Sequence, residues 1–175
     1  MNRALRFAPL VLLLLVVAAM VWRLATPTSS NVPSRLEGEP VPAFDLAAAL
    51  ESKPPLSSRD LATGRPRLLN IFASWCVPCI DEVKVLSQLK ARGVAIDGIA
   101  IRDTPADVAD FLARNGDPYE RIGSDPQSQL QIALGSSGVP ETFVIDGKGV
   151  IRFQHIGPIE SADMPLILQK LDQAR

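Results

Sequence analysis

The chain has 175 residues, which is long enough for one domain with its own hydrophobic core. It carries 18 basic and 19 acidic residues for a formal net charge of −1, so its charge does not point to a nucleic-acid-binding protein. With two cysteines and one histidine, it also has too few of these ligands for the four-coordinate site that structural zinc prefers. These limits favour a single globular domain, and any cysteine chemistry must come from one pair.

An unbroken apolar run extends from Phe7 to Trp22, and Arg3 and Arg6 precede it. Because basic residues stay on the cytoplasmic side of a membrane, this layout predicts that residues 1–25 form an uncleaved N-terminal transmembrane anchor, with the rest of the chain exported. A cleaved signal peptide is the alternative, although no small-x-small cleavage site directly follows the run. Either interpretation places the two cysteines in an oxidising compartment.

Residues 26–42 are rich in proline, serine and threonine and lack any periodicity, which predicts a tether that lets a globular domain at residues 43–175 stand off the membrane. An extended segment at residues 41–46 is expected to form an edge strand of the sheet. Residues 57–61 predict one helical turn.

The two cysteines lie at a predicted strand-to-helix turn. Residues 67–73 predict a buried strand and residues 75–92 an amphipathic helix, which puts Cys76 at the helix N-terminus and Cys79 one turn inside it. Free N–H groups and the positive end of the helix dipole favour a thiolate there, and a second cysteine can resolve a mixed disulfide. A C-x-x-C pair after a strand is typical of thioredoxin-like redox proteins. The alternatives are a structural disulfide and half of a zinc site.

The rest of the domain alternates strands and helices. Thr104-Pro105 and Asp125-Pro126 each predict an N-cap followed by a proline at the first helical position. The turn at residues 146–149 predicts a hairpin. Strands are expected at 94–101, 119–122, 139–145 and 150–155, and helices at 105–115, 126–134 and from 161 onward. A crossover helix requires parallel strands and the hairpin is antiparallel, so a mixed sheet with helices on both faces is predicted.

Two motifs together resemble a known family. Residues 75–79 (Trp-Cys-Val-Pro-Cys) after a strand, with residues 138–143 (Gly-Val-Pro-Glu-Thr-Phe) some sixty positions later, resemble thioredoxin-fold proteins. Residues 138–157 and the anchor are similar to the membrane-anchored thiol:disulfide reductases of cytochrome c maturation, the CcmG/DsbE type. The resemblance covers about residues 36–159. It implies a thioredoxin-like α/β fold, in which helices flank a central mixed β-sheet.

The resemblance also implies roles for individual residues. Cys76 is expected to be the nucleophile and Cys79 the resolving thiol. Pro140 matches the cis-proline of thioredoxin folds, and a cis bond would leave the backbone of Val139 free to pair with a substrate strand. Thr142, in the same motif, is expected to contribute to substrate binding. A simple strand-start proline is the alternative for Pro140.

Three more residues belong to the expected site. Glu82 and Glu141 match the family's acidic active-site pair, and a partly buried carboxyl near the sulfurs can carry the proton of Cys79. The alternative for Glu82 is an ordinary first-turn acid favoured by the helix dipole. Trp75 is expected to cover the disulfide and contact partners, or else to pack in the core. His155 is expected to have no catalytic role.

The implied function is a redox cycle on the periplasmic side of a bacterial inner membrane. Reduced Cys76 attacks a disulfide of apocytochrome c or of a haem-ligation thiol protein, and Cys79 then closes the internal disulfide. A DsbD/CcdA-type membrane protein supplies electrons, and no metal or organic cofactor is expected. The alternatives are a general extracytoplasmic thiol reductase, a Cu(I)-delivery module and a non-catalytic docking domain.

Overall fold

The computed structural model describes residues 8–25 and 36–175, and the chain divides into two units, Met1–Val32 and Pro33–Arg175. The described part of the first unit is one helix, α1 (Ala8–Ala25), which lies within the predicted anchor. Across the two described ranges, no helix combines the length and the apolarity that crossing a bilayer requires. The transmembrane anchor therefore stays a prediction.

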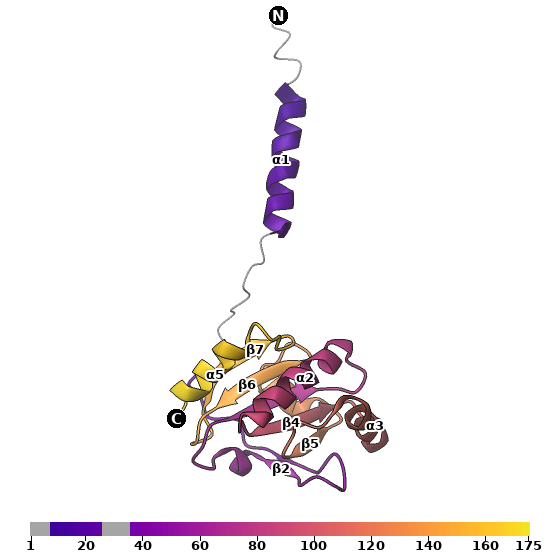
Figure 1. The fold of residues 1–175 in the computed structure, drawn as a ribbon, viewed down its shortest axis with the longest axis vertical. Helices are drawn as coiled ribbons and strands as arrows, with labels where there is room; N and C mark the ends of the chain where they lie inside the picture. Colours follow the sequence, from indigo (N-terminus) through magenta and orange to yellow (C-terminus); the bar gives the residue numbers. More distant parts are fainter. Residues whose placement is uncertain (1–7, 26–35) are drawn as a thin grey trace, which may run out of the picture. The chain divides into compact units, whose positions relative to one another are not determined.

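The second unit is built on a five-stranded sheet with the strand order β5-β4-β3-β6-β7 (Figure 1). Its strands are β3 (Arg67–Phe72), β4 (Ile96–Ile101), β5 (Ile122–Asp125), β6 (Glu141–Ile145) and β7 (Ile151–Ile156). The first three run parallel to one another, whereas β6 pairs antiparallel with both β3 and β7. The predicted mixed sheet is confirmed, including the closing hairpin.

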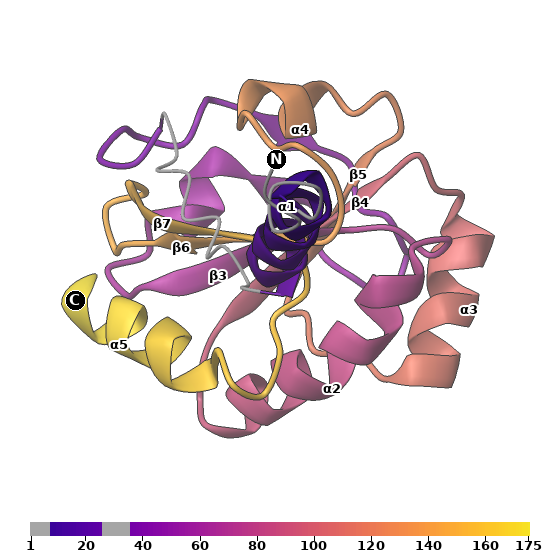
Figure 2. The same cartoon turned by 90° about the horizontal axis from the view of Figure 1, so that it is seen from above.

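Helices cover both faces of this sheet. Figure 2 shows α2 (Val77–Ala91), α3 (Pro105–Asn115) and α5 (Met164–Gln173) on one side, with α4 (Gln129–Ala133) on the other. All six residues of β3 and of β4 are buried, as expected for central strands that are covered on both faces. Helix α2, whose N-cap is Cys76, therefore packs on the face of the sheet whose strand β3 leads into it.

The two predicted cap-and-proline signals have different outcomes. Thr104 caps α3 as expected, because its side chain accepts a hydrogen bond from the N–H of Asp107 and Pro105 is the first helical residue. The same prediction is wrong for Asp125, which is the last residue of β5. Helix α4 starts later, at Gln129, yet the Asp125 carboxylate still accepts the N–H of Gln129 at 2.8 Å and of Leu130 at 2.9 Å. The backbone of Asp125 is used in strand pairing, while its side-chain carboxylate caps the N-terminus of α4.

The predicted edge strand at residues 41–46 is also wrong. Asp45 and Leu46 form β1, which pairs with β2 (Leu56–Ser57) in a separate two-stranded sheet. This small sheet packs on β5, because a Cβ on Gly123 would lie only 2.8 Å from the Leu46 side chain. The edge of β5 is paired instead by the residues that follow, with an isolated bridge between Ala48 and Gly123.

Several strands and helices begin at other residues than the sequence predicts. The expected strand at 119–122 begins only at Ile122, and the last helix begins at Met164 rather than at residue 161. The predicted helical turn at 57–61 is confirmed as a 3₁₀ helix, η2 (Ser58–Leu61).

The described part of the predicted tether packs on the globular unit. The N–H groups of Gly38 and Val41 donate to the carbonyls of Ile151 and Gly149 at 2.8 and 2.9 Å. These bonds join the chain from about Gly38 to the start of β7 and the turn before it. The remaining tether residues, 26–35, lie outside the described residues.

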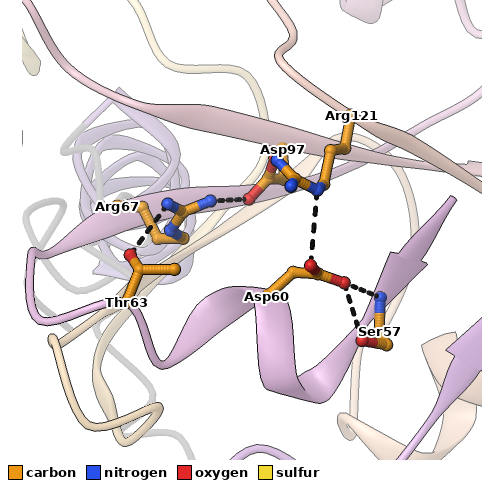
Figure 3. Close-up of polar contacts among 6 residues, drawn as sticks. All are labelled: Ser57, Asp60, Thr63, Arg67, Asp97 and Arg121. Carbon is orange, nitrogen blue, oxygen red and sulfur yellow. Dashed lines mark hydrogen bonds and ion pairs between the residues drawn. The ribbon is translucent and has the colours of Figure 1, made fainter. Parts of the chain in front are cut away.

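A buried ion pair joins the start of β3 to β4 (Figure 3). Arg67 donates to Asp97, and the two side chains are 5% and 0% exposed. Arg67 also donates to the Thr63 hydroxyl at 3.0 Å. Burial raises the pKa of Asp97, even though the charge of Arg67 acts in the opposite direction. This pair was not predicted from the sequence.

A second polar cluster lies beside it and ties η2 to the sheet (Figure 3). The carboxylate of Asp60 accepts hydrogen bonds from the backbone N–H and the hydroxyl of Ser57, and it pairs with Arg121 at 3.5 Å. Hydrogen bonding from Ser57 lowers the pKa of Asp60.

Candidate active site

Cys76 and Cys79 form a disulfide at the N-terminus of α2, with an S–S distance of 2.14 Å. Cys76 is the N-cap residue, with an extended backbone, and Pro78 lies in the first helical turn, where its missing N–H costs nothing. The first N–H groups of α2 therefore point toward Cys76, which favours a thiolate when the bond is reduced. The predicted placement of both cysteines is confirmed.

The residues around the disulfide expose apolar surface. Trp75 is 55% exposed and Val77 is 71% exposed, whereas Cys76 is only 4% exposed in this oxidised state. The exposure of Trp75 contradicts its alternative interpretation as a core residue. Its indole N–H donates to the carbonyl of Arg102 at 3.3 Å, which leaves much of the ring available to a partner.

The turn before the helix is tied to the segment that follows β4. Both the N–H and the hydroxyl of Ser74 donate to the carboxylate of Asp103, at 2.7 and 2.6 Å. Sequence analysis did not identify Asp103, because nothing in its local pattern distinguishes it from an acid near a helix start. The two bonds hold the turn between β3 and α2 (residues 73–76, the redox turn) against the β4–α3 connection.

The peptide bond between Val139 and Pro140 is cis, as the motif predicted. Pro140 comes directly before β6, and the pairing of Ile71 with Glu141 places it at the end of the sheet from which the redox turn leaves β3. Among the described residues, none hydrogen-bonds to the backbone of Val139, while the carbonyl of Pro140 accepts from Gly157 at 3.1 Å. The backbone of Val139 is thus available for pairing at this end of the sheet.

Glu82 lies on α2 three residues after Cys79 and is only 1% exposed. Residues three apart on a helix are neighbours, so its carboxyl lies on the same side of α2 as Cys79. One oxygen accepts from the Asn70 amide and the other from the N–H of Ile159, both at 3.0 Å. Burial raises the pKa of the Glu82 carboxyl from its ordinary 4.5 to about 7, although hydrogen bonds from three neighbours lower it. A group with that pKa can accept and release a proton near neutral pH.

A groove of about 580 Å³ opens beside Glu82, between the start of α2 and the loop that leads to α5. Val77 and Pro78 line it near the disulfide, and Pro158 and Glu160 line it on the loop side. The groove gives the otherwise buried carboxyl a route for protons to and from solvent.

Glu141 is fully buried in a different set of contacts. Its carboxylate accepts hydrogen bonds from the Ser136 hydroxyl at 2.7 Å, from the N–H of Ser137 at 2.9 Å and from the amide of Gln154. Neighbouring strand residues face opposite sides of a sheet, and Thr142 shares Asn70 with Glu82, so Glu141 faces the other side. The predicted acidic pair is therefore divided between the two faces of the sheet.

Thr142 is fully buried and accepts a hydrogen bond from the Asn70 amide at 2.9 Å. Its side chain therefore lies in the interior and not on a surface that a substrate can reach. His155 contacts the carbonyl of Pro158 at 3.2 Å and lies 3.8 Å from Asp163, away from any cysteine contact in the described chain. In residues 8–25 and 36–175, no group of three His, Cys, Asp or Glu side chains is arranged to hold a metal ion.

Asn70 is a second site residue that sequence analysis did not identify. Its signal was a single polar residue inside the apolar run Leu68-Leu69-Asn70-Ile71-Phe72, and it is fully buried on β3. A buried amide in such a position requires hydrogen-bond partners, and here the partners belong to the site.

The comparisons with known proteins agree with this geometry. The Redoxin family model matches residues 36–168. Thiol:disulfide interchange protein HelX of Rhodobacter capsulatus is 37% identical over 172 residues, which are 98% of this chain and 96% of that one. DsbE proteins of Escherichia coli K12 and Pseudomonas fluorescens are 37% and 41% identical and cover 91% of this chain, with 88% of each relative matched.

Solved structures give the same result. A crystal structure described as a thiol:disulfide interchange protein DsbE from Chlorobium tepidum has a TM-score of 0.68 and 27% identity, and the match covers 79% of this chain and 96% of that one. The thioredoxin-like fold and the Cys76–Cys79 pair thus occur together with close sequence similarity to proteins of known class. The chain belongs to the redoxin family and, within it, to the thiol:disulfide interchange proteins of the DsbE and HelX type.

Proposed function

We propose that this oxidoreductase is a periplasmic, membrane-anchored reductase that opens disulfides of apocytochrome c or of a haem-ligation thiol protein. The observation that carries the redox part is the Cys76–Cys79 disulfide, with Cys76 at the N-cap of α2. The basic residues and apolar run at the N-terminus support the anchor and the exported location.

In the proposed cycle the Cys76 thiolate attacks one sulfur of a substrate disulfide. The substrate S–S bond breaks, a mixed disulfide forms, and the other substrate sulfur leaves as a thiolate that takes up a proton. Cys79 then loses its proton to Glu82 and attacks the Cys76 sulfur. The mixed disulfide breaks, and the second substrate sulfur leaves as a thiolate that takes up a proton. Two electrons pass to the substrate, and the Cys76–Cys79 bond stores the oxidised state until a DsbD/CcdA-type membrane protein returns two electrons.

We assign substrate contact to the backbone of Val139 and to the exposed ring of Trp75. The unpaired backbone beside the cis-proline supports strand-like pairing with a substrate segment, and Trp75 offers apolar area next to the disulfide. For Glu141 we propose an indirect role: it orders the loop before Pro140 through Ser136 and Ser137. Thr142 then contributes through Asn70 rather than by touching the substrate.

The test uses the full chain and a peptide that carries an oxidised C-x-x-C-H segment. Cys79→Ser should trap a mixed disulfide with the peptide, and the matched Cys76→Ser variant should trap none. Cys76 should also alkylate faster than Cys79 in the reduced wild type. Equal trapping by both variants contradicts the assignment of the nucleophile.

Two further measurements address the substrate and the direction of electron flow. Reduction of an unrelated disulfide, such as those of insulin, at the same rate as the peptide would favour a general extracytoplasmic reductase. The reduction potential should lie near that of thioredoxin, about −270 mV, rather than near about −120 mV, where disulfide donors lie.

A further inference from the structure

The side-chain amide of Asn70 makes three hydrogen bonds to buried side chains, and both of its N–H donors are used. Its NH₂ group donates to Glu82 at 3.0 Å and to the Thr142 hydroxyl at 2.9 Å, and its carbonyl oxygen accepts from the Tyr119 hydroxyl at 2.7 Å. All four side chains are buried. Because a buried polar group that loses its partner is costly, this network specifies one arrangement of the four groups.

Tyr119 and Glu82 together determine which way the amide points. The ionised carboxyl of Glu82 can only accept, so the NH₂ group of Asn70 faces Glu82, and the Tyr119 hydroxyl donates to the oxygen on the other side. Burial raises the pKa of Tyr119 further above its ordinary value, which keeps the hydroxyl a donor at any pH at which the protein works.

The Tyr119 ring is itself held in place by close packing. It stacks on Phe72 with ring centroids 4.7 Å apart and planes 12° apart. Gly98 provides the space, because a Cβ there would lie 2.9 Å from the Phe72 ring and 3.0 Å from the Tyr119 ring. Phe72 is the last residue of β3, the strand that leads into the redox turn. The ring that orients the Asn70 amide therefore packs against the residue that precedes this turn.

We propose that Asn70 is a positioning residue for thiol–disulfide exchange: it holds the Glu82 carboxylate as the proton acceptor for Cys79, and Tyr119 keeps the Asn70 amide in its donating orientation. The inference rests on the proton-accepting role of Glu82 in the proposed function. Asn70 touches neither sulfur in the described contacts, and it acts through the carboxylate alone.

The surroundings of Glu82 make this donor important. The other titratable groups near it are Cys79 on α2, Tyr119, and the acids Asp81 and Glu160, which line the groove. Among the described residues that line the groove, none is basic. Hydrogen bonds from neutral donors are thus the means by which the site stabilises the ionised carboxyl against burial.

The test compares Asn70→Leu and Tyr119→Phe with the wild-type full chain. Asn70→Leu removes both donated bonds at similar volume, and Tyr119→Phe removes only the hydroxyl that orients the amide. Asn115→Leu is the matched control, because Asn115 also donates from a side-chain amide, to the carbonyl of Phe111 at 2.8 Å, but has no contact with Glu82. The first readout is the carbon-13 NMR titration of the Glu82 carboxyl in the reduced protein. The second is the pH profile of Cys79 alkylation in a Cys76→Ser background.

Asn70→Leu should raise the pKa of Glu82 by about one unit, a tenfold change in proton binding, and shift the alkylation profile of Cys79 with it. Tyr119→Phe should shift both in the same direction by less, and the Asn115 variant should match the wild type. If Asn70→Leu does not fold, Tyr119→Phe still tests the proposal, because it removes only one hydroxyl.

An unchanged Glu82 titration in a folded Asn70 or Tyr119 variant overturns the inference. A shifted titration with an unchanged Cys79 profile also overturns it, because the carboxylate then takes no part in the thiol step. The second outcome also removes the proton transfer to Glu82 from the proposed cycle. Neither outcome tests whether the protein reduces disulfides, which is tested separately by opening of the C-x-x-C-H disulfide with the wild type.

Discussion

Glu82 should make the folded protein lose stability as the pH rises from 4.5 to about 7. The change to make is Glu82→Gln, which keeps the shape of the side chain and removes its titration. Burial raises the pKa of the folded-state carboxyl from the ordinary 4.5 to about 7. The folded state therefore binds a proton more tightly than the unfolded state between these two values.

The sign and size of the effect follow from this difference. Below pH 4.5 the carboxyl is protonated in both states and costs nothing, and as the pH rises through about 7 the folded state must hold a buried charge. The difference between about 7 and 4.5 corresponds to a loss of about 3 kcal/mol in the free energy of unfolding. Glu82→Gln should lack this loss, although it disturbs one of the two accepted hydrogen bonds at every pH.

The assay is denaturant unfolding of the oxidised full chain at a series of pH values from 4.5 to 8. Other titrating groups are common to the two proteins, so the difference between the two stability curves isolates Glu82. This difference should change by about 3 kcal/mol across the series in favour of the variant. Glu160→Gln, on the exposed rim of the same groove, should follow the wild type. Parallel stability curves for the wild type and Glu82→Gln would refute the raised pKa of the Glu82 carboxyl.

Two further substitutions test the packing that supports the site. Asp97→Ala leaves the buried guanidinium of Arg67 without its partner and should lower the free energy of unfolding by about 3–5 kcal/mol, and a loss below 1 kcal/mol would mean that water or Thr63 replaces the carboxylate. Gly147→Ala should cost about 1–3 kcal/mol, because the new Cβ would lie 2.5 Å from a backbone carbon of Gly64, and stability equal to the wild type would contradict that close contact. Both losses are measured by denaturant unfolding.

The redox turn could be predicted from the sequence because its signals are local. An apolar run predicted β3, helical spacing predicted α2, and a proline in the first turn placed Cys76 at the N-cap. The Thr104 cap succeeded for the same reason, since cap and proline are adjacent in the chain. The cis bond before Pro140 was predicted from the motif's resemblance to a family. No local rule predicts it, because most X–Pro bonds are trans.

Local signals failed where strand pairing decided the outcome. Asp125 carries the pattern of a helix cap, but pairing with Ile101 makes it the last residue of β5. Leu46 has the pattern of an edge-strand residue, yet it packs over Gly123 in a second small sheet. In both cases the competing partner is far away in the chain, and the local sequence contains no information about it.

The sequence by itself determined that two cysteines lie at a helix N-terminus, which predicted a redox pair wherever the helix packs. Only the tertiary structure decided what surrounds them. It placed Glu82 and Glu141 on opposite faces of the sheet, because Glu82 lies on α2, which covers one face, whereas the alternation of side chains along β6 turns Glu141 to the other face. It also brought the hydroxyl of Tyr119 to Asn70, 49 residues away, so that a single buried amide orients the carboxylate beside Cys79.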